Sequence, residues 1–415
     1  MAGTQAAQWL GIAPDDPLGL QALPYGSYCA PHHATRPRVG VAVGDRVLDL
    51  TTAAGRLAPV RAHLFESGRL DAFLAEGHLA WTQIRADLTR WLSQDRYREA
   101  VQDLLIPVSQ TEPQLPFSVA DYADFYSGEQ HATNASAIFR PGAQPALAPN
   151  WRHQPVGYHG RSGTVVISGT PIRRPCGQFR QPGASAPVFG PTARLDFEAE
   201  LGFVVGAGSM PGEPVTTSRF AQHVFGVCLV NDWSARDIQG WESAPLGPFL
   251  GKSFGTSVSP WIVPLAALEH ARVAPPSRQT ELLPYLTEAA DWGLDIDFEV
   301  AVNGHVVSRP PYAGMHWSPA QMLAHLTVTG AAVRTGDLFA SGTVSGARRD
   351  QRGSMLELSW GGTDPLALPD GSTRLWLEDS DEVTISASAA AAGGIRVSLG
   401  EVRGQILPAQ PTALR

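Results

Sequence analysis

Two glutamates two positions apart, Glu198 and Glu200, lie in an alternating run of apolar and acidic residues at 195–205. In a β-strand such residues point to the same face, with Cα atoms roughly 6.5–7 Å apart. Carboxylates in that arrangement can share one hard cation through their oxygens. Asp232, in the later run 231–239, could supply a third carboxylate from a neighbouring strand. The pattern predicts either a metal site or the solvated face of a sheet.

A second alternating run shows that acidic residues alone do not decide between these two interpretations. Asp295, Asp297 and Glu299 repeat the same spacing within residues 294–302. Either run could be an ordinary amphipathic strand with one face in water. The first run is followed by three residues able to bind an anion: Arg236, Gln239 and Lys252. These neighbours favour a site near the first run, whereas a plain hairpin follows the second.

A group of aromatic, histidine and arginine residues precedes the first acidic run. It consists of Asp124-Phe125-Tyr126, His131, Arg140 and Tyr158-His159-Gly160-Arg161. Hydroxyl, imidazole and guanidinium groups together suit a small anionic substrate. A lone histidine is more often a structural hydrogen-bonding residue, so His131 gains weight only from this company.

The composition limits the classes of protein to which the chain can belong. Its 415 residues exceed one small core, so two domains are the default. A net charge of −8 argues weakly against nucleic-acid binding, which needs clustered Lys and Arg. No apolar run approaches the length of a membrane span, and the N-terminus shows no secretory signal. The three widely spaced cysteines are typical of reduced thiols in a cytosolic protein.

Common catalytic signatures fail when they are tested against the sequence. A P-loop at Lys252 fails because Leu246 stands where its first glycine is required. The dinucleotide fingerprint fails because Gly206 and Gly208 lead into Pro211 and not into a helix. No G-x-S-x-G, H-E-x-x-H or Cys/His cluster occurs. What remains is a site with oxygen ligands, or no metal site.

Residues 1–117 are predicted to form a small β-rich domain with a few helices. Residues 39–43 and 46–50 alternate around a tight turn, which is typical of a hairpin. Apolar residues at spacings of three and four predict a helix over 79–92. The proline-rich stretch 106–117 marks the boundary.

Residues 118–415 are predicted to be mostly β. The apolar run 223–231 indicates a strand buried on both faces, and Asn303 begins the strongest hairpin signal. Ser318 is expected to cap a short helix. Further strands are expected at 164–168, 355–360, 374–377, 382–385 and 395–399. The alanine-rich run 387–392 is expected to be an exposed loop or edge.

Several longer runs carry a family resemblance. They are Asp124-Phe125-Tyr126-Ser127 with His131, Tyr158-His159-Gly160-Arg161, Leu195-Asp196-Phe197-Glu198-x-Glu200, residues 231–239 with 245–256, Ser341-Gly342-Thr343, and residues 353–360. Together they resemble the fumarylacetoacetate hydrolase family, over essentially the whole chain. The resemblance implies a mostly β fold in a cytoplasmic homodimer. Residues 1–117 would form an N-terminal SH3-like β-barrel domain with short helices, and residues 118–415 a C-terminal mixed β-sandwich roll.

The resemblance also implies a metal centre and the residues around it. Ca²⁺ or Mg²⁺ is expected on four carboxylates, with two further residues close by: Asp124, Glu198, Glu200 and Asp232, then Lys252 and Thr256. His131 is expected to be the general base, oriented by Glu357. The oxyanion donors are expected to be Arg236, Gln239 and Lys252. Substrate contacts are expected from Tyr126, Arg140, Tyr158, Gln239 and Thr343.

The expected reaction is hydrolysis of the C–C bond of 4-fumarylacetoacetate by His-activated water, which gives fumarate and acetoacetate in the last step of tyrosine and phenylalanine catabolism. Ser243 departs from the family pattern, which usually has a second aromatic residue there. The departure leaves a related acylpyruvate or another diketo acid as an alternative substrate. The non-catalytic alternatives are a metal-stabilised β-domain that only binds a ligand, and a sheet with solvated acids.

Overall fold

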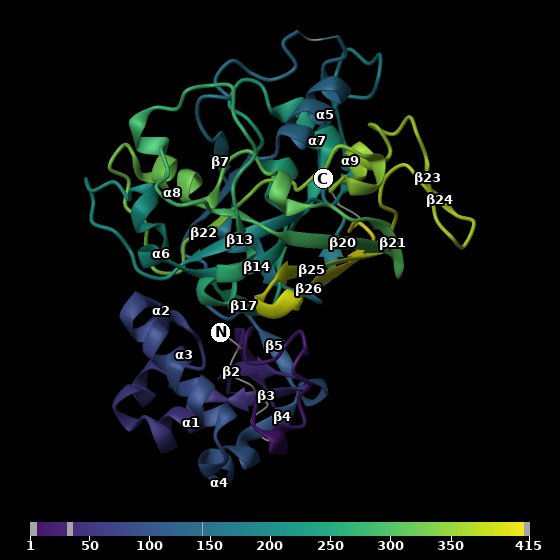
Figure 1. The fold of residues 1–415 in the computed structure, drawn as a ribbon. Coiled ribbons are helices and arrows are strands. Elements are labelled where there is room, and N and C mark those ends of the chain that lie inside the picture. Colours follow the sequence, from purple (N-terminus) through teal and green to yellow (C-terminus); the bar gives the residue numbers. More distant parts are fainter. Residues whose placement is uncertain (1–5, 31–35, 143, 411–415) are drawn as a thin grey trace.

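The computed structural model describes residues 6–30, 36–142 and 144–410 of the chain. Within these ranges the regular structure is mostly β-strand, as expected, and the helices are short. Figure 1 shows the N-terminal elements, in purple and blue, as a smaller part below the body formed by the rest. In the described part of the chain no helix is long and apolar enough to cross a membrane.

The helices divide between these two parts. Those of the N-terminal part are α1 (Leu50–Leu57), α2 (Asp71–Ala75), α3 (His78–Ser93) and α4 (Arg98–Val101). Those of the larger part are α5 (Glu129–Phe139), α6 (Phe220–His223), α7 (Arg236–Glu242), α8 (Pro319–Thr327) and α9 (Met355–Leu358). Trp81, Ile84 and Leu88 form the buried face of α3, which confirms the helix predicted from apolar spacing.

One mixed sheet, with thirteen strands among the described residues, runs through both parts. Its main path is β4 (Leu105–Pro107), β3 (Arg46–Asp49), β2 (Arg38–Val43), β1 (Tyr25–Cys29), β17 (Trp261–Pro264), β14 (Val224–Asp232), β13 (Ala199–Val205), β22 (Leu338–Ala340), β6 (Tyr122–Phe125) and β7 (Gly157–His159). Three more strands branch from this path: β5 (Glu112–Gln114), β8 (Val165–Ile167) and β16 (Thr256–Val258). This large sheet connects the N-terminal part to the strands that carry the acidic residues.

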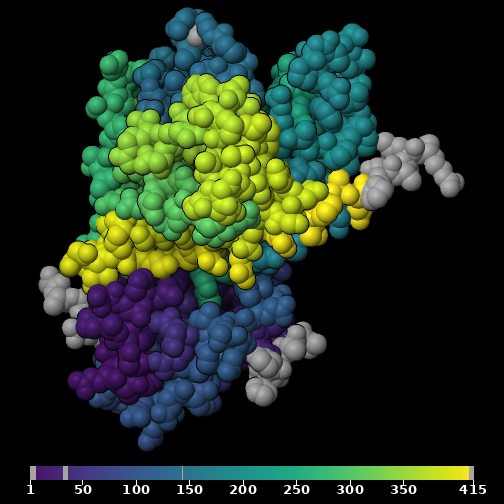
Figure 2. All heavy atoms as spheres, turned by 90° about the vertical axis from the view of Figure 1, so that its right-hand side faces the viewer, coloured from purple at the N-terminus to yellow at the C-terminus, as the bar shows by residue number. Residues whose placement is uncertain are grey.

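A second sheet lies beside the large one. Its order is β21 (His305–Ser308), β20 (Ile296–Val302), β25 (Glu382–Ala390), β26 (Arg396–Leu407) and β9 (Ile172–Arg173). The remaining strands form short pairs: β10 (Cys176–Phe179) with β11 (Val188–Pro191), β12 (Leu195–Asp196) with β15 (Ser234–Ala235), β18 (Arg272–Val273) with β19 (Gly293–Leu294), and β23 (Leu366–Ala367) with β24 (Thr373–Arg374). Figure 2 shows the yellow C-terminal strands against the purple N-terminal part, where Ser398 N donates to Pro17 O at 2.9 Å.

The central strands of the large sheet are buried on both faces. Leu229 of β14 belongs to a core that also contains Val300 and Ile385 of the second sheet. Its neighbour Val230 belongs to the other core, with Phe73 of α2. Successive residues of a strand point to opposite faces, so the large sheet is a middle layer between these two cores. This double burial explains the continuous apolar run of β14 and confirms that prediction.

Other predicted elements are also confirmed. The hairpin of β2 and β3 forms, and β20 turns into β21 through Asn303 and Gly304, both with positive φ. Ser318 caps α8, with its hydroxyl accepting from Gln321 N at 3.2 Å.

Three predicted elements are wrong and one fold prediction is not confirmed. The strand expected at 374–377 is one of the three, because β24 covers only Thr373–Arg374. Residues 355–360 were expected to form a strand, but the first four of them form helix α9. The Ser354 hydroxyl accepts from Glu357 N at 3.3 Å and caps the first turn of this helix. The alanine-rich run, expected as a loop or edge, lies largely within β25, between β20 and β26. A closed SH3-like barrel is not confirmed, since β1 pairs with β17 and joins the N-terminal strands to the large sheet.

Asp381 connects three segments near the start of β25. Its buried carboxylate accepts from Arg374 Nε at 2.9 Å, Asn303 Nδ2 at 2.8 Å and Glu378 N at 2.7 Å. Asp381→Asn should lower the free energy of unfolding by about 1–3 kcal/mol, because at least one buried donor loses its acceptor. Urea denaturation measures the change, and an unchanged midpoint would contradict this account.

Candidate active site and metal centre

The register of the large sheet brings three of the predicted carboxylates to one face. Glu200 and Gly202 point the same way from β13, and Gly202 pairs with Ala340 of β22, which pairs with Asp124 of β6. Ala340 contributes only a methyl group, so the carboxylates on either side of it can approach each other. Asp232 lies diagonally opposite Glu200, two residues beyond its partner on β14.

Glu198 joins this group from a break in the strand and not from the continuous strand that the alternation predicts. β12 ends at Asp196 and β13 begins at Ala199, and Asp232 N donates to Glu198 O at 3.2 Å across the break. Oxygens of the four carboxylates lie within 4.8 Å of one another. Each residue is at most 4% exposed. The interpretation of this run as a solvated face is therefore wrong.

Several oxygens in this carboxylate cluster lack hydrogen-bond donors. Both oxygens of Glu200 and Oδ1 of Asp124 are buried without a partner among the described residues. Burial raises the pKa of both carboxyls well above the usual range, and neighbouring carboxylates add to the effect. Buried carboxylates are normally paired with cations or bound to metals. The all-oxygen donor set with unsatisfied oxygens fits a hard divalent cation.

Two buried cationic residues face the cluster, Arg236 from α7 and Lys252 from a short 3-10 helix. Lys252 Nζ donates to Glu198 and, at 2.8 Å, to Asp232. Arg236 Nη2 donates to Glu198 Oε1 at 2.6 Å. Burial alone raises the pKa of Glu198, but Arg236 and Lys252 outweigh it and hold that pKa well below its usual value. Glu198 is thus kept ionised by fixed positive charges.

Close packing places Lys252 beside Gln239. Gly251 lies against α7, where a Cβ atom would stand 2.8 Å from Gln239 N, so only glycine fits. Arg236 Nη1 donates to Gln239 Oε1 at 3.1 Å, and the Gln239 amide NH₂ makes no hydrogen bond within the described part of the chain. The three predicted oxyanion donors therefore lie together on one side of the cluster.

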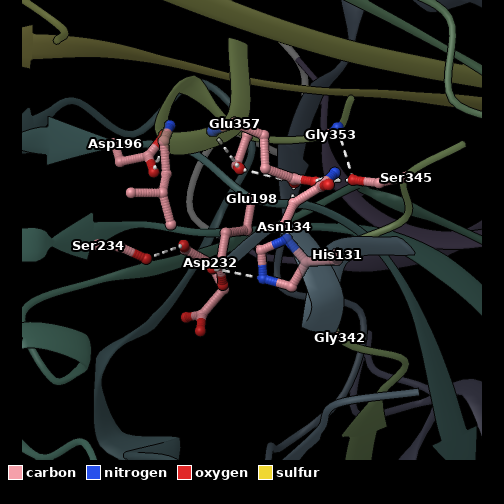
Figure 3. A network of polar contacts seen from close by, with 12 residues as sticks. His131, Asn134, Asp196, Glu198, Asp232, Ser234, Gly342, Ser345, Gly353 and Glu357 are labelled. Carbon is pink, nitrogen blue, oxygen red and sulfur yellow. Dashed lines mark hydrogen bonds and ion pairs between the residues drawn. The ribbon is translucent and has the colours of Figure 1, made fainter. Parts of the chain in front are cut away.

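His131, on α5, lies between two carboxylates (Figure 3). Its Nδ1 is 2.7 Å from Glu357 Oε2, and its Nε2 is 3.8 Å from Glu198 Oε1. An ionised Glu357 can only accept, so Nδ1 is the donor in this contact, and Nε2 is the ring nitrogen that faces Glu198. Burial raises the pKa of Glu357, but His131 and other donors hold it below its usual value. Those other donors are Asn134, Ser345 and Ser354.

Most of the predicted site residues line one cavity of about 790 Å³. They are Asp124, Tyr126, His131, Arg140, Tyr158, Glu198, Glu200, Arg236, Gln239, Lys252 and Thr343. Ser243 lines the cavity as well. Asp232, Thr256 and Glu357 do not line the cavity. Asp232 contacts Lys252, Thr256 contacts Asp232, and Glu357 contacts His131. The volume suits a small organic acid.

The predicted substrate-contacting residues differ in the hydrogen bonds that their side chains already make within the protein. The Tyr158 hydroxyl donates to Asp232 Oδ2 at 2.8 Å, just as Thr256 Oγ1 donates to Oδ1 at 2.9 Å. These two hydroxyls therefore orient a candidate metal ligand. The Thr343 hydroxyl is buried with no partner in the described structure, and Arg140 is exposed at the cavity. Arg140 Nη2 donates to Ser136 Oγ at 3.0 Å, and its other donors, like the Thr343 hydroxyl and the Gln239 amide NH₂, make no hydrogen bond to the described residues.

Reasoning from the sequence missed a buried carboxylate behind the site. Asp196 accepts from Arg236 Nε at 2.7 Å and from Met355 N at 2.6 Å. Burial raises the pKa of Asp196, and Arg236 opposes that shift. Its place two residues before Glu198, in the same acidic run, was the available signal. Asn134, Ser345 and Ser354 were missed too, because nothing local links them to Glu357.

The second acidic run lies elsewhere on the protein. Glu299 pairs with Arg309 at 2.9 Å, and Asp297 pairs with Arg396 at the same distance, on side chains that are 44% and 64% exposed. The solvated-face interpretation is correct for this run. Two runs with the same spacing thus have opposite environments.

Asp232→Ala should weaken Ca²⁺ or Mg²⁺ binding by more than about 10-fold, because it removes a buried oxygen ligand and an acceptor for Lys252. The matched variant Asp297→Ala removes a solvated carboxylate and should leave binding unchanged. Isothermal titration and metal content after dialysis measure the difference. Equal metal content in the two variants would reject the ligand set.

Two family models match the two parts of the chain. The model described as Fumarylacetoacetase N-terminal matches residues 21–116, and the model described as Fumarylacetoacetate (FAA) hydrolase C-terminal matches residues 121–406. Solved structures share the fold at low identity. A fumarylacetoacetate hydrolase from psychrophilic Exiguobacterium antarcticum gives a TM-score of 0.54 at 17% identity, over 94% of this chain and 100% of that one. A maleylpyruvate hydrolase from Sphingobium sp. SYK-6 gives 0.51 at 15%, over 93% and 100%.

Relatives of much higher identity match nearly the whole chain. The fumarylacetoacetase of Rattus norvegicus is 44% identical over 416 residues, which covers 97% of this chain and 99% of the relative. Those of Homo sapiens and Arabidopsis thaliana are each 42% identical, with the same two coverages. This chain therefore belongs to the fumarylacetoacetate hydrolase family.

Proposed function

We propose that the chain hydrolyses the C–C bond of 4-fumarylacetoacetate to fumarate and acetoacetate, the last step of tyrosine and phenylalanine catabolism. The observation that supports this most directly is the position of His131, whose Nε2 faces the carboxylate cluster while Nδ1 contacts Glu357. An imidazole beside a candidate cation site supports hydrolysis of a diketo acid, because such a reaction needs a base close to a Lewis acid. The identity of 42–44% with fumarylacetoacetases supports the same conclusion.

His131 acts in this proposal as the general base. Its Nε2 takes a proton from water as the water oxygen attacks the fumaroyl carbonyl carbon. Glu357 holds the ring tautomer and stabilises the imidazolium that forms, as the carboxylate of a catalytic triad does. The ring of Tyr126 meets the imidazole edge to face at 5.4 Å and restricts its rotation. No nucleophilic serine or cysteine is needed.

Arg236, Gln239 and Lys252 stabilise the negative charge that develops on the oxygen of the attacked carbonyl. The amide NH₂ of Gln239 and the two cationic groups line the cavity beside the base. Donors fixed in this way need no reorganisation during the reaction, and loss of one typically costs roughly 10²–10³ in rate. Collapse of the alkoxide breaks the C–C bond, and the enolate that leaves takes the proton held on the His131 imidazolium, which gives acetoacetate and restores the base.

The substrate's carboxylates and carbonyls are assigned to groups along the cavity. Arg140 is exposed there and can pair with a terminal carboxylate. The Thr343 hydroxyl is free to donate, and Tyr126 and Tyr158 line the same space. The exposed Arg140 supports recognition of charge at the cavity opening, and the buried Thr343 hydroxyl supports hydrogen bonding further inside.

Asp124, Glu198, Glu200 and Asp232 are the residues that would hold Ca²⁺ or Mg²⁺. The bound ion supplies Lewis-acid stabilisation for the carbonyl oxygens and the enolate leaving group. The four carboxylates and the two cationic residues Lys252 and Arg236 leave two negative charges, which a divalent ion balances.

A related acylpyruvate or another diketo acid is the second candidate substrate. Ser243 lines the cavity, and its small side chain leaves space where the family pattern has an aromatic residue. A role in ligand binding alone is disfavoured, because binding does not need a histidine oriented by the buried Glu357.

The finer structural assignments also belong to this proposal. An SH3-like domain over residues 1–117 and a β-roll over 118–415 are supported by the separate family matches to the two parts. A homodimer in the cytoplasm is supported by the family resemblance and by the unpaired cysteines among the described residues.

The proposed function is tested by following loss of the fumarylacetoacetate chromophore with purified protein. Activity should disappear with a chelator and return with Ca²⁺ or Mg²⁺, because the buried carboxylates need a counter-charge. Acylpyruvates should show kcat/KM at least about 10-fold lower. A kcat/KM that is higher for an acylpyruvate than for fumarylacetoacetate would identify the acylpyruvate, the second candidate, as the preferred substrate. No turnover of either class would reject both.

His131→Gln should lower kcat by roughly 10²–10⁴-fold, because glutamine cannot take the proton from water. Binding of an unreactive substrate analogue should stay near the wild-type level. The matched variant is His223→Gln: His223 is also buried, but its Nδ1 contacts Ala207 O at 2.8 Å, away from the cavity. Stopped-flow and steady-state assays compare the variants. A near-wild-type kcat in His131→Gln would contradict the assignment of His131 as the general base.

A further inference from the structure

Asp196 contacts two segments of the proposed active site, here called its arms: helix α9, which carries Glu357, and the side chain of Arg236. Its side chain is fully buried, and it does not line the cavity. Oδ1 accepts from Met355 N at 2.6 Å and from Phe197 N at 2.8 Å. Oδ2 accepts from Leu356 N at 3.0 Å and from Arg236 Nε at 2.7 Å. Figure 3 shows Asp196 on the far side of Glu198 from His131.

One arm runs through helix α9 to the base. Met355 and Leu356 supply the first two backbone N–H groups of α9, and Glu357 follows directly in the same turn. Glu357 in turn holds His131 Nδ1 at 2.7 Å. A four-residue helix has little intrinsic stability, so external contacts at its first turn set its orientation.

The other arm runs through Arg236 to the oxyanion donors. β12 pairs with β15, and Arg236 N donates to Arg194 O at 2.9 Å, which brings Arg236 alongside Asp196. The guanidinium then reaches Glu198 with Nη2 and Gln239 with Nη1. A guanidinium held at Nε by a carboxylate has a fixed plane, so its other donors have fixed directions.

We infer that Asp196 is a positioning residue that fixes the base and the oxyanion donors relative to each other. It receives four donors and offers only acceptors, so a neutral amide in its place would face at least one buried N–H with an NH₂ group. Asp196 contacts neither the cavity nor the free oxygens of the carboxylate cluster. Its loss should therefore affect turnover more than substrate affinity or metal binding. The effect on turnover rests on the proposed function.

A purely structural role is the competing explanation, and Asp381 provides a matched control. Asp381 is also a buried carboxylate that accepts from an arginine Nε and a backbone N–H, but it lies by β25 and away from the cavity. Asp381→Asn should therefore match the loss of stability of Asp196→Asn without its loss of turnover.

The kinetic test compares Asp196→Asn with Asp381→Asn. We expect kcat of Asp196→Asn to fall by roughly 10²-fold, as for a displacement near 1 Å. KM should stay within about threefold, because Arg140 and Thr343 are untouched, and metal content should match the wild type. In Asp381→Asn kcat should stay within about twofold of the wild type. If Asp196→Asn is not recovered folded, Asp196→Glu replaces it, because it keeps the charge and shifts the carboxylate by one methylene.

A spectroscopic test does not depend on turnover. The proton shared by His131 Nδ1 and Glu357 should give a downfield NMR resonance, assigned by its loss in His131→Gln. Asp196→Asn should shift or broaden this resonance, and Asp381→Asn should not. Failure of the wild type to turn over fumarylacetoacetate would reject the proposed function but leave this test in place.

Three outcomes would overturn the inference. The first is unchanged kcat in folded Asp196→Asn and in Asp196→Glu. The second is loss of metal in proportion to loss of activity, which would place Asp196 in the metal centre. The third is an unshifted His131 resonance in Asp196→Asn.

Discussion

The burial of four carboxylates within 4.8 Å of one another is the constraint on which the rest of the site depends. Like charges in a medium of low polarity repel strongly, and an unpaired buried carboxylate is costly. Lys252 and Arg236 offset part of that charge, and both are themselves buried because they are paired. Oxygens of Glu200 and Asp124 have no hydrogen-bond partner, so the described protein groups do not offset the negative charge on that side of the cluster. This repulsion explains why the buried Arg236 and Lys252 side chains lie beside the buried carboxylates.

The sequence predicts this site only in part, and the limits have physical causes. Periodicity and turn residues identify α3, α8, β14 and the hairpins, because those elements have clear apolar faces or strict turn requirements. Periodicity does not tell a buried acidic face from a solvated one: Glu200 and Asp297 occupy equivalent patterns, and their burial differs because other layers cover only the first strand face. The residues that follow each run were the further signal in the sequence. Glu357 was expected from family resemblance alone. Helix α9 is too short for a helical period, so its residues suggested a strand.

Two of the segments at the candidate site are very short, α9 and the 3-10 helix Leu250–Lys252, and both are held by side chains bound to backbone groups. The N–H groups of α9 are bound by Ser354 and Asp196, and Glu242 accepts from Gly251 N at 2.8 Å just before Lys252. Such segments gain little from helix or strand propensity, so polar networks determine their geometry. The buried network around Asp196 and Glu357 has both carboxylates paired with donors, and such a network holds α9, Arg236 and His131 in fixed relative positions. The long strands supply the platform beneath it.

The pairing of β1 with β17 has a consequence for how the chain reaches this state during synthesis. Tyr25 and Gly26 pair with Ile262 and Trp261, so the N-terminal strands complete their edge only after more than half of the chain has left the ribosome. Until then that edge and the apolar face behind it are open to other chains. Pairing over so long a sequence separation is also slow to form. The nascent chain therefore passes through a period in which protection by chaperones matters more than for a domain that closes on itself.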